Sequence, residues 1–284
     1  MTERESMHLP RLAMEPAEVD RLYDAGRAVP DSAVRMAGWT ERSRQARARL
    51  DGRLDVAYGP SLDEYLDVFP GPVGGPLHVF IHGGYWRRFT AKDFSFVAEP
   101  LVAQGYTVVV PNYALCPRVR IGEIVRQVRA ALHWTIHHPD VHGGDIRRLT
   151  ISGHSAGGHL VGMMLATDWS AWRSMPAEPV AAAVALSGLY DLAPFAYSWL
   201  QPVLQLDHHD IEQLSPVRQV KTQATSLILA AGQLESPAFH AQAGLFEAVW
   251  RACGNRVERS TCGDRDHFTI VEDLPALLER ETRR

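Results

Sequence analysis

The spacing of hydrophobic and polar positions changes near residue 52. Residues 1–52 are rich in charge and helix-like, with a basic helical face in "WTERSRQARARL". Eight short apolar runs follow, and helical stretches separate them from the third run onward. This alternation predicts an α/β fold with a mostly parallel eight-stranded sheet flanked by helices, in which the first two strands form an antiparallel entry. The runs are "LDVAY", "YLDVF", "LHVFIH", "YTVVVPNY", "LTISG", "VAAAVALSG", "SLILAAG" and "RVERST".

Two segments fall outside the strand and helix alternation. One is residues 1–52, and the other is residues 192–216, "LAPFAYSWLQPVLQLDHHDIEQLSP". We expect both to form a small helical cap that covers a pocket at the edge of the sheet. A chain of 284 residues is long enough for a sizeable core, and we interpret residues 1–284 as a single domain that includes the cap.

Composition and charge exclude some classes of binding partner. The chain is 46% hydrophobic and 22% charged with a net charge of −4, so no basic field is available to hold nucleic acid or an anionic membrane. The start "MTERESMHLPRL" lacks the apolar core of a secretory signal, and no apolar run is long enough to span a membrane. We therefore expect a cytoplasmic protein that acts on a small molecule, with its oligomeric state open and a homodimer among the alternatives.

Metal and disulfide chemistry are not expected. The three cysteines, Cys116, Cys253 and Cys262, have no CxxC spacing, so we interpret them as free thiols. The adjacent histidine pairs at 137–138 and 208–209 lack the carboxylate spacing of a zinc set. We predict no metal and no cofactor.

The first stretch with a candidate catalytic residue is "LTISGHSAGGHL". It contains a G-x-S-x-G pattern centred on Ser155, with a strand-like run before it and a helical run after it. In α/β-hydrolases this context forms a nucleophile elbow, a tight strand-to-helix turn that exposes the serine and needs glycines beside it. Ser155 is therefore the candidate nucleophile of an α/β-hydrolase fold.

The stretch "VFIHGGYW" supplies a candidate oxyanion hole. A serine hydrolase stabilises the oxyanion of its tetrahedral intermediate with backbone N–H groups, and one of these belongs to the residue after the nucleophile, Ala156. The others come from the loop after the third strand, where Gly83 and Gly84 stand. The alternative for this pair of glycines is a plain turn.

The serine also needs a base and an acid that orients the base. His267 follows the last strand-like run and precedes a C-terminal helix, as the chain order Ser, acid, His requires. Glu235, just after the seventh run, is the favoured acid, and Asp191, after the sixth, is the alternative. Asp264 and Asp266 are too close to His267 in sequence to reach behind its imidazole.

At this point the sequence resembles the arylformamidases, also called kynurenine formamidases, a branch of the hormone-sensitive-lipase-like α/β-hydrolases. The likeness spans most of the chain, and it implies the roles of nucleophile for Ser155, base for His267 and acid for Glu235, although a member of the family has Asp at this last position. The motifs that carry it are "HGGYW", "GHSAGGHL", "LSGLYDL", "LSPVRQV", "ESPAFHAQ" and "DHF".

The resemblance implies hydrolysis of N-formyl-L-kynurenine to kynurenine and formate through a formyl-serine intermediate. The alternative is a carboxylesterase that acts on short-chain or aryl esters, because the same triad serves both reactions. A fold that has lost its activity and only binds is a third alternative, which the complete set of candidate residues disfavours.

Aromatic and basic residues near these motifs are candidates for binding the substrate. Arg87, Arg88 and Arg118 are candidate partners for a substrate carboxylate, with a surface position as the alternative for each. The candidate aromatic wall consists of Tyr85, Trp86, Tyr190, Phe239 and Phe268.

Overall fold

The computed structural model describes residues 15–282, in which eight strands form one sheet. Their order is β1-β2-β4-β3-β5-β6-β7-β8, and β2 runs antiparallel to both β1 and β4, whereas the other neighbours are parallel. The eight predicted runs and the antiparallel entry are thus confirmed. The strands are β1 (Arg53–Ala57), β2 (Tyr65–Phe69), β3 (Pro76–Ile81), β4 (Thr107–Pro111), β5 (Asp145–His154), β6 (Ala182–Leu186), β7 (Ser226–Gly232) and β8 (Val257–Cys262).

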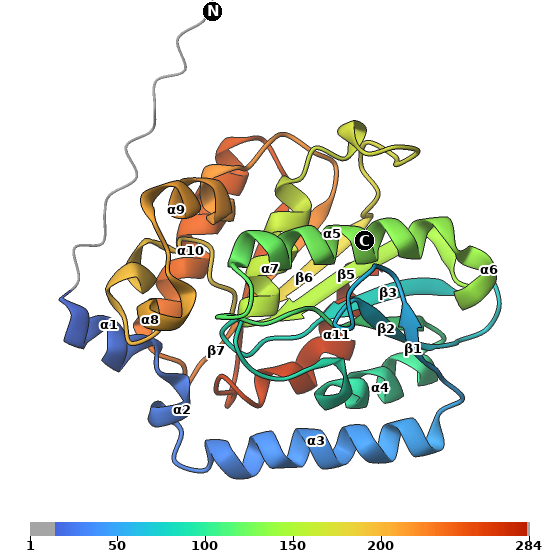
Figure 1. Ribbon diagram of the computed structural model, residues 1–284, viewed down its shortest axis with the longest axis horizontal. Helices are drawn as coiled ribbons and strands as arrows, with labels where there is room; N and C mark the ends of the chain where they lie inside the picture. The colour runs from blue at the N-terminus through green and yellow to red at the C-terminus, as the bar shows by residue number, and fades with distance from the viewer. Residues whose placement is uncertain (1–14, 283–284) are drawn as a thin grey trace, which may run out of the picture.

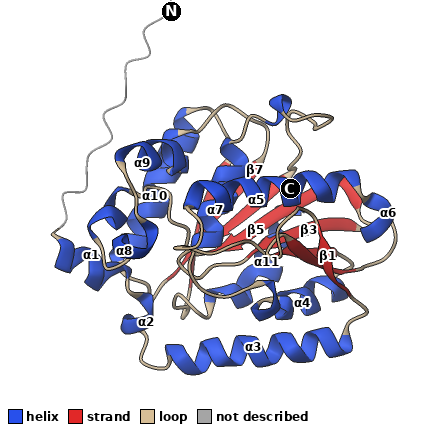
Figure 2. Cartoon of the chain, viewed as in Figure 1, coloured by secondary structure: helices blue, strands red, loops and turns tan. Residues whose placement is uncertain are grey.

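Helices cover both faces of this sheet (Figures 1 and 2). Helices α5, α7 and α10 lie on one face, and α4 and α11 lie on the other, with α3 outside α4. The α-helices are α1 (Pro16–Tyr23), α2 (Ala25–Ala28), α3 (Ser32–Arg49), α4 (Ala98–Ala103), α5 (Ile121–His137), α6 (Pro139–His142), α7 (Ala156–Ala166), α8 (Gln201–Leu204), α9 (His208–Leu214), α10 (Pro237–Ala252) and α11 (Leu274–Thr282). Short 3-10 helices are η1 (Ala91–Asp93), η2 (Ser95–Val97), η3 (Trp169–Ala171), η4 (Ala193–Tyr197), η5 (Pro216–Arg218) and η6 (Ile270–Asp273).

The central strands are buried on both faces. Every residue of β4, β6 and β7 is buried, which explains why "TVVVP" and "AAVAL" are continuous apolar runs without polar alternation. Parallel strands end at the same edge of a sheet, so the loops after β3, β5, β6, β7 and β8 gather there.

The N-terminal helices and residues 192–216 meet over this edge of the sheet. The backbone N–H of Trp199 donates to the carboxylate of Asp20 in α1, at 2.8 Å. The ring of Tyr23 packs at 4.8 Å from Phe195 of η4. Two segments that are far apart in sequence therefore lie side by side, as we expected of the cap. The first part of the expected cap segment and the polar start of the chain lie outside the described residues.

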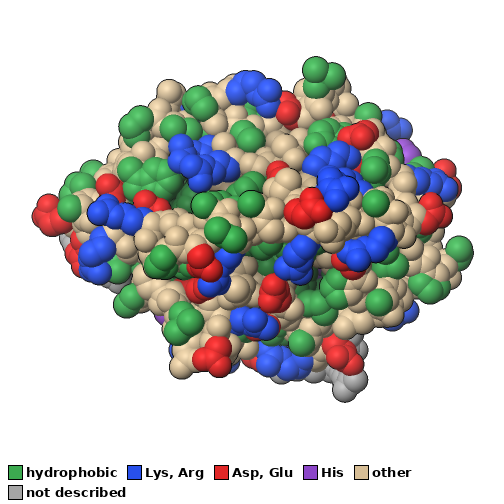
Figure 3. All heavy atoms as spheres, turned by 90° about the horizontal axis from the view of Figure 1, so that it is seen from below, with side chains coloured by type: hydrophobic (Ala, Val, Ile, Leu, Met, Phe, Trp, Pro, Cys, Tyr) green, Lys and Arg blue, Asp and Glu red, His purple; other side chains and the backbone are tan. Residues whose placement is uncertain are grey.

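The distribution of charge on the surface and the state of the cysteines agree with what the sequence predicts. Figure 3 shows basic and acidic side chains interspersed over one face, without a continuous area of one sign. In residues 15–282 no helix has the length and apolarity needed to span a membrane. All three cysteines are free thiols, as predicted.

Candidate active site

Ser155 stands on a strained turn between β5 and α7. Its φ of 56° and ψ of −117° lie outside the usual regions for a residue with a side chain, at a cost of about 1–3 kcal/mol. Its N–H donates to the carbonyl of Leu186 at 2.8 Å, which helps to hold the turn. A β-carbon at Gly153 would lie 2.3 Å from the carbonyl oxygen of Gly157, so this turn excludes larger residues. The sequence therefore folds here as the elbow that its pattern predicted.

The glycine loop after β3 lies directly against this turn. A β-carbon at Gly83 would lie 2.5 Å from the carbonyl oxygen of His154 and 3.2 Å from Cβ of Ser155, while Gly84 has a φ of +112°. The N–H groups of Gly83, Gly84 and Ala156 donate to no acceptor within residues 15–282. The structure therefore brings three free backbone donors to the side of Ser155, which is the arrangement an oxyanion hole requires.

Trp86 anchors the glycine loop from behind. Tyr85 and Trp86 both adopt positive φ values, 52° and 57°, which turn the indole into the protein interior. The indole N–H of Trp86 donates to Nδ1 of His159 in α7 at 3.1 Å, and Nε2–H of His159 donates to the carbonyl of Leu214 at 2.7 Å. This chain of hydrogen bonds joins the loop to α7 and to residues 192–216.

His267 and Glu235 form a buried pair. Nδ1 of His267 donates to Oε2 of Glu235 at 2.7 Å, and the two side chains are only 6% and 1% exposed. The other carboxylate oxygen accepts from the hydroxyl of Ser187 and from the N–H of Gly232, at 2.7 Å for the latter. These bonds fix the carboxylate and leave Nε2 of His267 as the ring nitrogen available for chemistry. Sequence reasoning missed Ser187, for which the only signal is its place directly after β6.

Asp191, the alternative acid, has other partners. Its Oδ1 accepts from the N–H of Ala193 at 3.1 Å and lies 3.4 Å from Nη2 of Arg218. It therefore opens the segment 192–216 as a turn residue. The structure brings Glu235, and not Asp191, to His267.

Asp266 holds the loop that carries His267. Its Oδ1 accepts from the N–H groups of Phe268 at 2.9 Å and Thr269 at 3.0 Å, and its Oδ2 pairs with Arg35 of α3. The carboxylate therefore supports the backbone around His267, and α3 braces the same loop.

Ser155 and His267 line one cavity of about 300 Å³. Its walls are largely aromatic, which fits a small aryl ligand. Of the predicted aromatic wall, Tyr85 and Phe268 line the cavity. Sequence reasoning missed several lining residues because they come from the α1–α3 region, from positions on either side of η1, and from residues 192–216: Asp24, Met36, Trp39, Phe89, Phe94 and Trp199.

The other three expected wall residues lie behind the cavity, so contact with substrate does not fit their positions. Trp86 is fully buried in its bond to α7. Tyr190 stacks on Phe246 at 4.4 Å, and Phe239 packs on the imidazole of His267 at 4.5 Å. Each supports the site from the hydrophobic core.

The three candidate arginines differ in their position relative to the cavity. Arg87 and Arg88 line the cavity, whereas Arg118 is exposed and pairs with Asp63 at 2.6 Å. The surface position that was the alternative for all three describes Arg118, and Arg88 is also exposed, at the rim of the cavity, whereas Arg87 is partly buried.

Histidines flanking the motifs are held neutral in structural roles. His154 donates from Nε2 to the carbonyl of His267 at 2.7 Å, and burial, followed by the charge of His267, holds the pKa of His154 well below its usual range. Burial lowers the pKa of His82 and of His159 to about 4 each. These rings support the site and are unsuited to act as its base.

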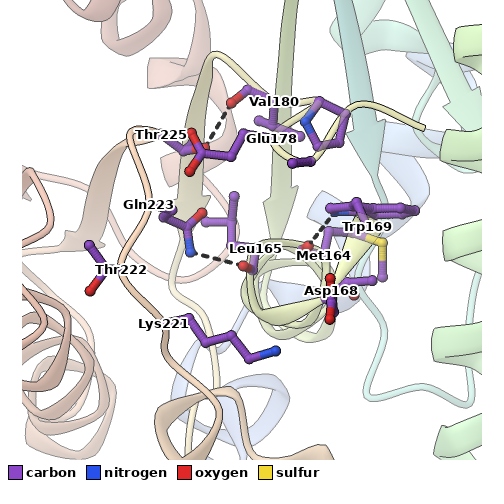
Figure 4. Close-up of a pocket in the computed structure, with 13 residues that line it drawn as sticks. Met164, Leu165, Asp168, Trp169, Glu178, Val180, Lys221, Thr222, Gln223 and Thr225 are labelled. Carbon is purple, nitrogen blue, oxygen red and sulfur yellow. Dashed lines mark hydrogen bonds between the residues drawn. The ribbon is translucent and has the colours of Figure 1, made fainter. Parts of the chain in front are cut away.

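A second cavity of about 220 Å³ lies at the opposite edge of the sheet, just before β6 and β7 (Figure 4). Its polar side chains bond to the protein's own carbonyls: Gln223 donates to Leu165 at 2.9 Å, and Thr225 to Val180 at 2.8 Å. No set of three or more His, Cys, Asp or Glu residues that could hold a metal occurs within residues 15–282.

Comparisons with known proteins agree with this geometry. The sequence model of the BD-FAE family matches residues 70–248. The kynurenine formamidase of Danio rerio is 30% identical over 279 residues, which cover 92% of each chain. Esterase LipQ of Mycobacterium tuberculosis is 26% identical over 223 residues, 70% of this chain and 53% of LipQ. The crystal structure of a proposed thioesterase from Silicibacter sp. tm1040 superposes with a TM-score of 0.81 at 29% identity, and covers 91% of this chain and 95% of its own.

Proposed function

Because the chain belongs to the BD-FAE family and to the kynurenine formamidases, and is a hydrolase, we propose that it hydrolyses N-formyl-L-kynurenine to L-kynurenine and formate. The observation that carries the proposal is that Ser155 and His267 line the same cavity, which also has several aromatic residues in its wall, and that His267 is bound to Glu235. Nucleophile, base and acid are then Ser155, His267 and Glu235.

The reaction begins with attack of the Ser155 hydroxyl on the formyl carbon, while Nε2 of His267 takes the hydroxyl proton. The carbonyl oxygen becomes an oxyanion, which the N–H groups of Gly83, Gly84 and Ala156 stabilise. Loss of one such donor costs about 10²- to 10³-fold in rate.

The protonated His267 then gives its proton to the aryl nitrogen as the C–N bond breaks, and L-kynurenine leaves. The formyl group remains as an ester of Ser155. His267 takes a proton from water as the water oxygen attacks the formyl carbon, and then gives that proton to Ser155 as the ester bond breaks. The product leaves as formic acid, which releases its own proton to the solvent and becomes formate. No metal or cofactor takes part in these steps.

An esterase is the second candidate, and the similarity to LipQ favours it. Esters are easier acyl donors than amides, so the same residues would cleave short-chain or aryl esters. The difference between the two reactions lies in the leaving group that the cavity accepts.

The test is the ratio of kcat/KM for N-formyl-L-kynurenine to kcat/KM for p-nitrophenyl acetate, with the Ser155→Ala protein as the blank. A value for the formamide near or above about 10⁴ M⁻¹s⁻¹, typical of an enzyme on its own substrate, supports the formamidase. Turnover of the ester alone would leave the esterase as the function.

A further inference from the structure

We propose that Arg87, Trp199 and Asp24 bind the charged amino-acid head of the substrate, with the α-carboxylate on Arg87 and Trp199 and the α-ammonium on Asp24. This inference rests on the proposed function and deepens it, because it assigns the residues that distinguish an amino-acid formamide from a simple aryl ester.

Arg87 extends from the same loop that carries the oxyanion donors. Its backbone N–H donates to the carbonyl of Gly84 at 3.1 Å, and its guanidinium lies 4.9 Å from the centre of the Trp199 ring. Stacking on an aromatic face orients an arginine while leaving its N–H groups in the plane free to donate. The position of Arg87 relative to Ser155 is therefore set by the loop itself.

Two residues of this cavity wall each carry a buried N–H donor without an acceptor. Nε of Arg87 and Nε1 of Trp199 are both buried, and neither has a hydrogen-bond partner within residues 15–282. Buried donors are nearly always paired, so two unpaired ones on the wall of one cavity need a physical reason. A carboxylate supplies two acceptor oxygens and a negative charge, which suits an arginine beside an indole N–H.

No carboxylate of the described chain takes this place. Burial, followed by the neighbouring charge of Arg88, lowers the pKa of Arg87, and Asp24 acts on it only through its charge, without a hydrogen bond. The guanidinium is thus partly desolvated without a direct anionic partner, a costly arrangement that a bound carboxylate relieves.

Asp24 lies on the same cavity wall and is held by the same loop. The hydroxyl of Tyr85 donates to the carbonyl of Tyr23 and lies 3.3 Å from the N–H of Ala25, so it holds the backbone on both sides of Asp24. One carboxylate oxygen of Asp24 accepts from the N–H of Arg27 at 3.0 Å, and no bond to the other is present in the described part of the chain. That second oxygen is available for an ammonium group.

The arrangement of charges matches a zwitterion. N-formyl-L-kynurenine carries its formamide and its amino-acid side chain on neighbouring ring positions, so the scissile bond and the charged head lie on the same side of the ring. Trp39 and Phe268 line the cavity as contacts for the ring. Gly84 and Arg87 line the same cavity from one loop, so this loop can serve both the reacting carbonyl and the charged head. A simple ester lacks these charges and gains nothing from Arg87 or Asp24.

The experiment measures binding by titration calorimetry of the full chain at pH 7.5 with two probes, L-kynurenine and 2′-aminoacetophenone, which has the same aryl ketone without the amino-acid head. The variants are Arg87→Met and Asp24→Asn, the latter chosen because Asn keeps the helix cap. Matched controls are Arg118→Met, on the surface, and Asp207→Asn, which changes the capping residue of α9. Thermal unfolding midpoints check that each variant folds.

We expect Arg87→Met to weaken L-kynurenine binding about 10- to 100-fold, as for the loss of a charge-assisted hydrogen bond, and 2′-aminoacetophenone binding less than about twofold. Asp24→Asn should act in the same direction, and the controls should not. In turnover, Arg87→Met should raise KM for the formamide more than it lowers kcat. Partial recovery is expected with Arg87→Lys, which keeps the charge but loses the Nε donor.

Two results overturn the inference: equal weakening of both probes by Arg87→Met, or L-kynurenine binding to the wild type no more tightly than 2′-aminoacetophenone. A failure of the proposed function is distinct, because the wild type would then leave N-formyl-L-kynurenine intact while L-kynurenine still bound through Arg87.

Discussion

Replacing Glu235 with Gln is expected to abolish most of the activity while leaving the fold intact. The two side chains have the same shape, so the decisive change is in the hydrogen bonds. The N–H of Gly232 and the hydroxyl of Ser187 both donate to one oxygen of Glu235, and the amide oxygen of Gln must replace that acceptor. The amide NH₂ then faces Nδ1 of His267, where the carboxylate accepted before.

An NH₂ group facing Nδ1 forces the proton of His267 onto Nε2, the nitrogen that must accept the proton of Ser155. A change of this kind in a serine triad lowers kcat about 10⁴-fold. The opposite orientation of the amide would keep an acceptor for Nδ1 of His267, but it would leave the N–H of Gly232 without an acceptor, at a cost of about 1–3 kcal/mol. This orientation therefore restores only part of the activity. We therefore expect a loss of about 10³- to 10⁴-fold, or about 4–5.5 kcal/mol in the activation barrier.

The assay is kcat for p-nitrophenyl acetate and for N-formyl-L-kynurenine, with circular dichroism to verify the fold. Asp191→Asn is the matched control, because it removes a similarly buried carboxylate that contacts Arg218 instead of His267. If Glu235→Gln kept activity within tenfold of the wild type, or if Asp191→Asn lost more, the assignment of the acid would be refuted.

Three further predictions concern the nucleophile, metals and acid stability. Ser155→Ala should retain less than about a hundredth of wild-type kcat with either substrate, and more would indicate a different nucleophile. A chelator-treated, metal-free sample should keep its activity, whereas a loss restored by zinc would refute the serine mechanism. Burial lowers the pKa of His78 to about 3 in the folded protein, whereas in the unfolded chain it stays near 6.5. Below about pH 6.5 the unfolded chain therefore binds a proton at His78 that the folded protein does not bind, so the free energy of unfolding falls as the pH drops. Between pH 7 and 5 this amounts to about 2 kcal/mol in the free energy of unfolding, and urea titrations of His78→Gln should show a dependence smaller by that amount.

The strands and the elbow could be predicted because their signals are local. Each buried strand is a short apolar run, and the glycines on either side of Ser155 are required by contacts of the turn itself. The order of acid and base also follows the chain, so Glu235 could be favoured over Asp191 from its place after the seventh run.

The two segments that cover the cavity could be predicted, but the individual residues of its wall could not, because they depend on contacts between distant segments. Trp39 comes from α3 and Trp199 from the segment after β6, and nothing in either local pattern indicates that they share a cavity. Contacts within the folded protein also decide whether an aromatic residue near the motifs points into the cavity or into the core. The positive φ of Trp86 turns its indole inward, and Tyr190 finds a stacking partner in α10.

The proposed catalytic residues and part of the cavity wall come from different parts of the chain, and this separation has an evolutionary consequence. Ser155, Glu235 and His267 all stand on loops at the end of the sheet, whereas Met36 and Trp39 of α3, and Asp24 at the start of α2, belong to the helical region that precedes its first strand. Mutations in those helices can therefore alter the accepted leaving group while the hydrolytic residues stay unchanged. Relatives of this chain can diverge in substrate through a part of the sequence in which a search for catalytic motifs would find no difference.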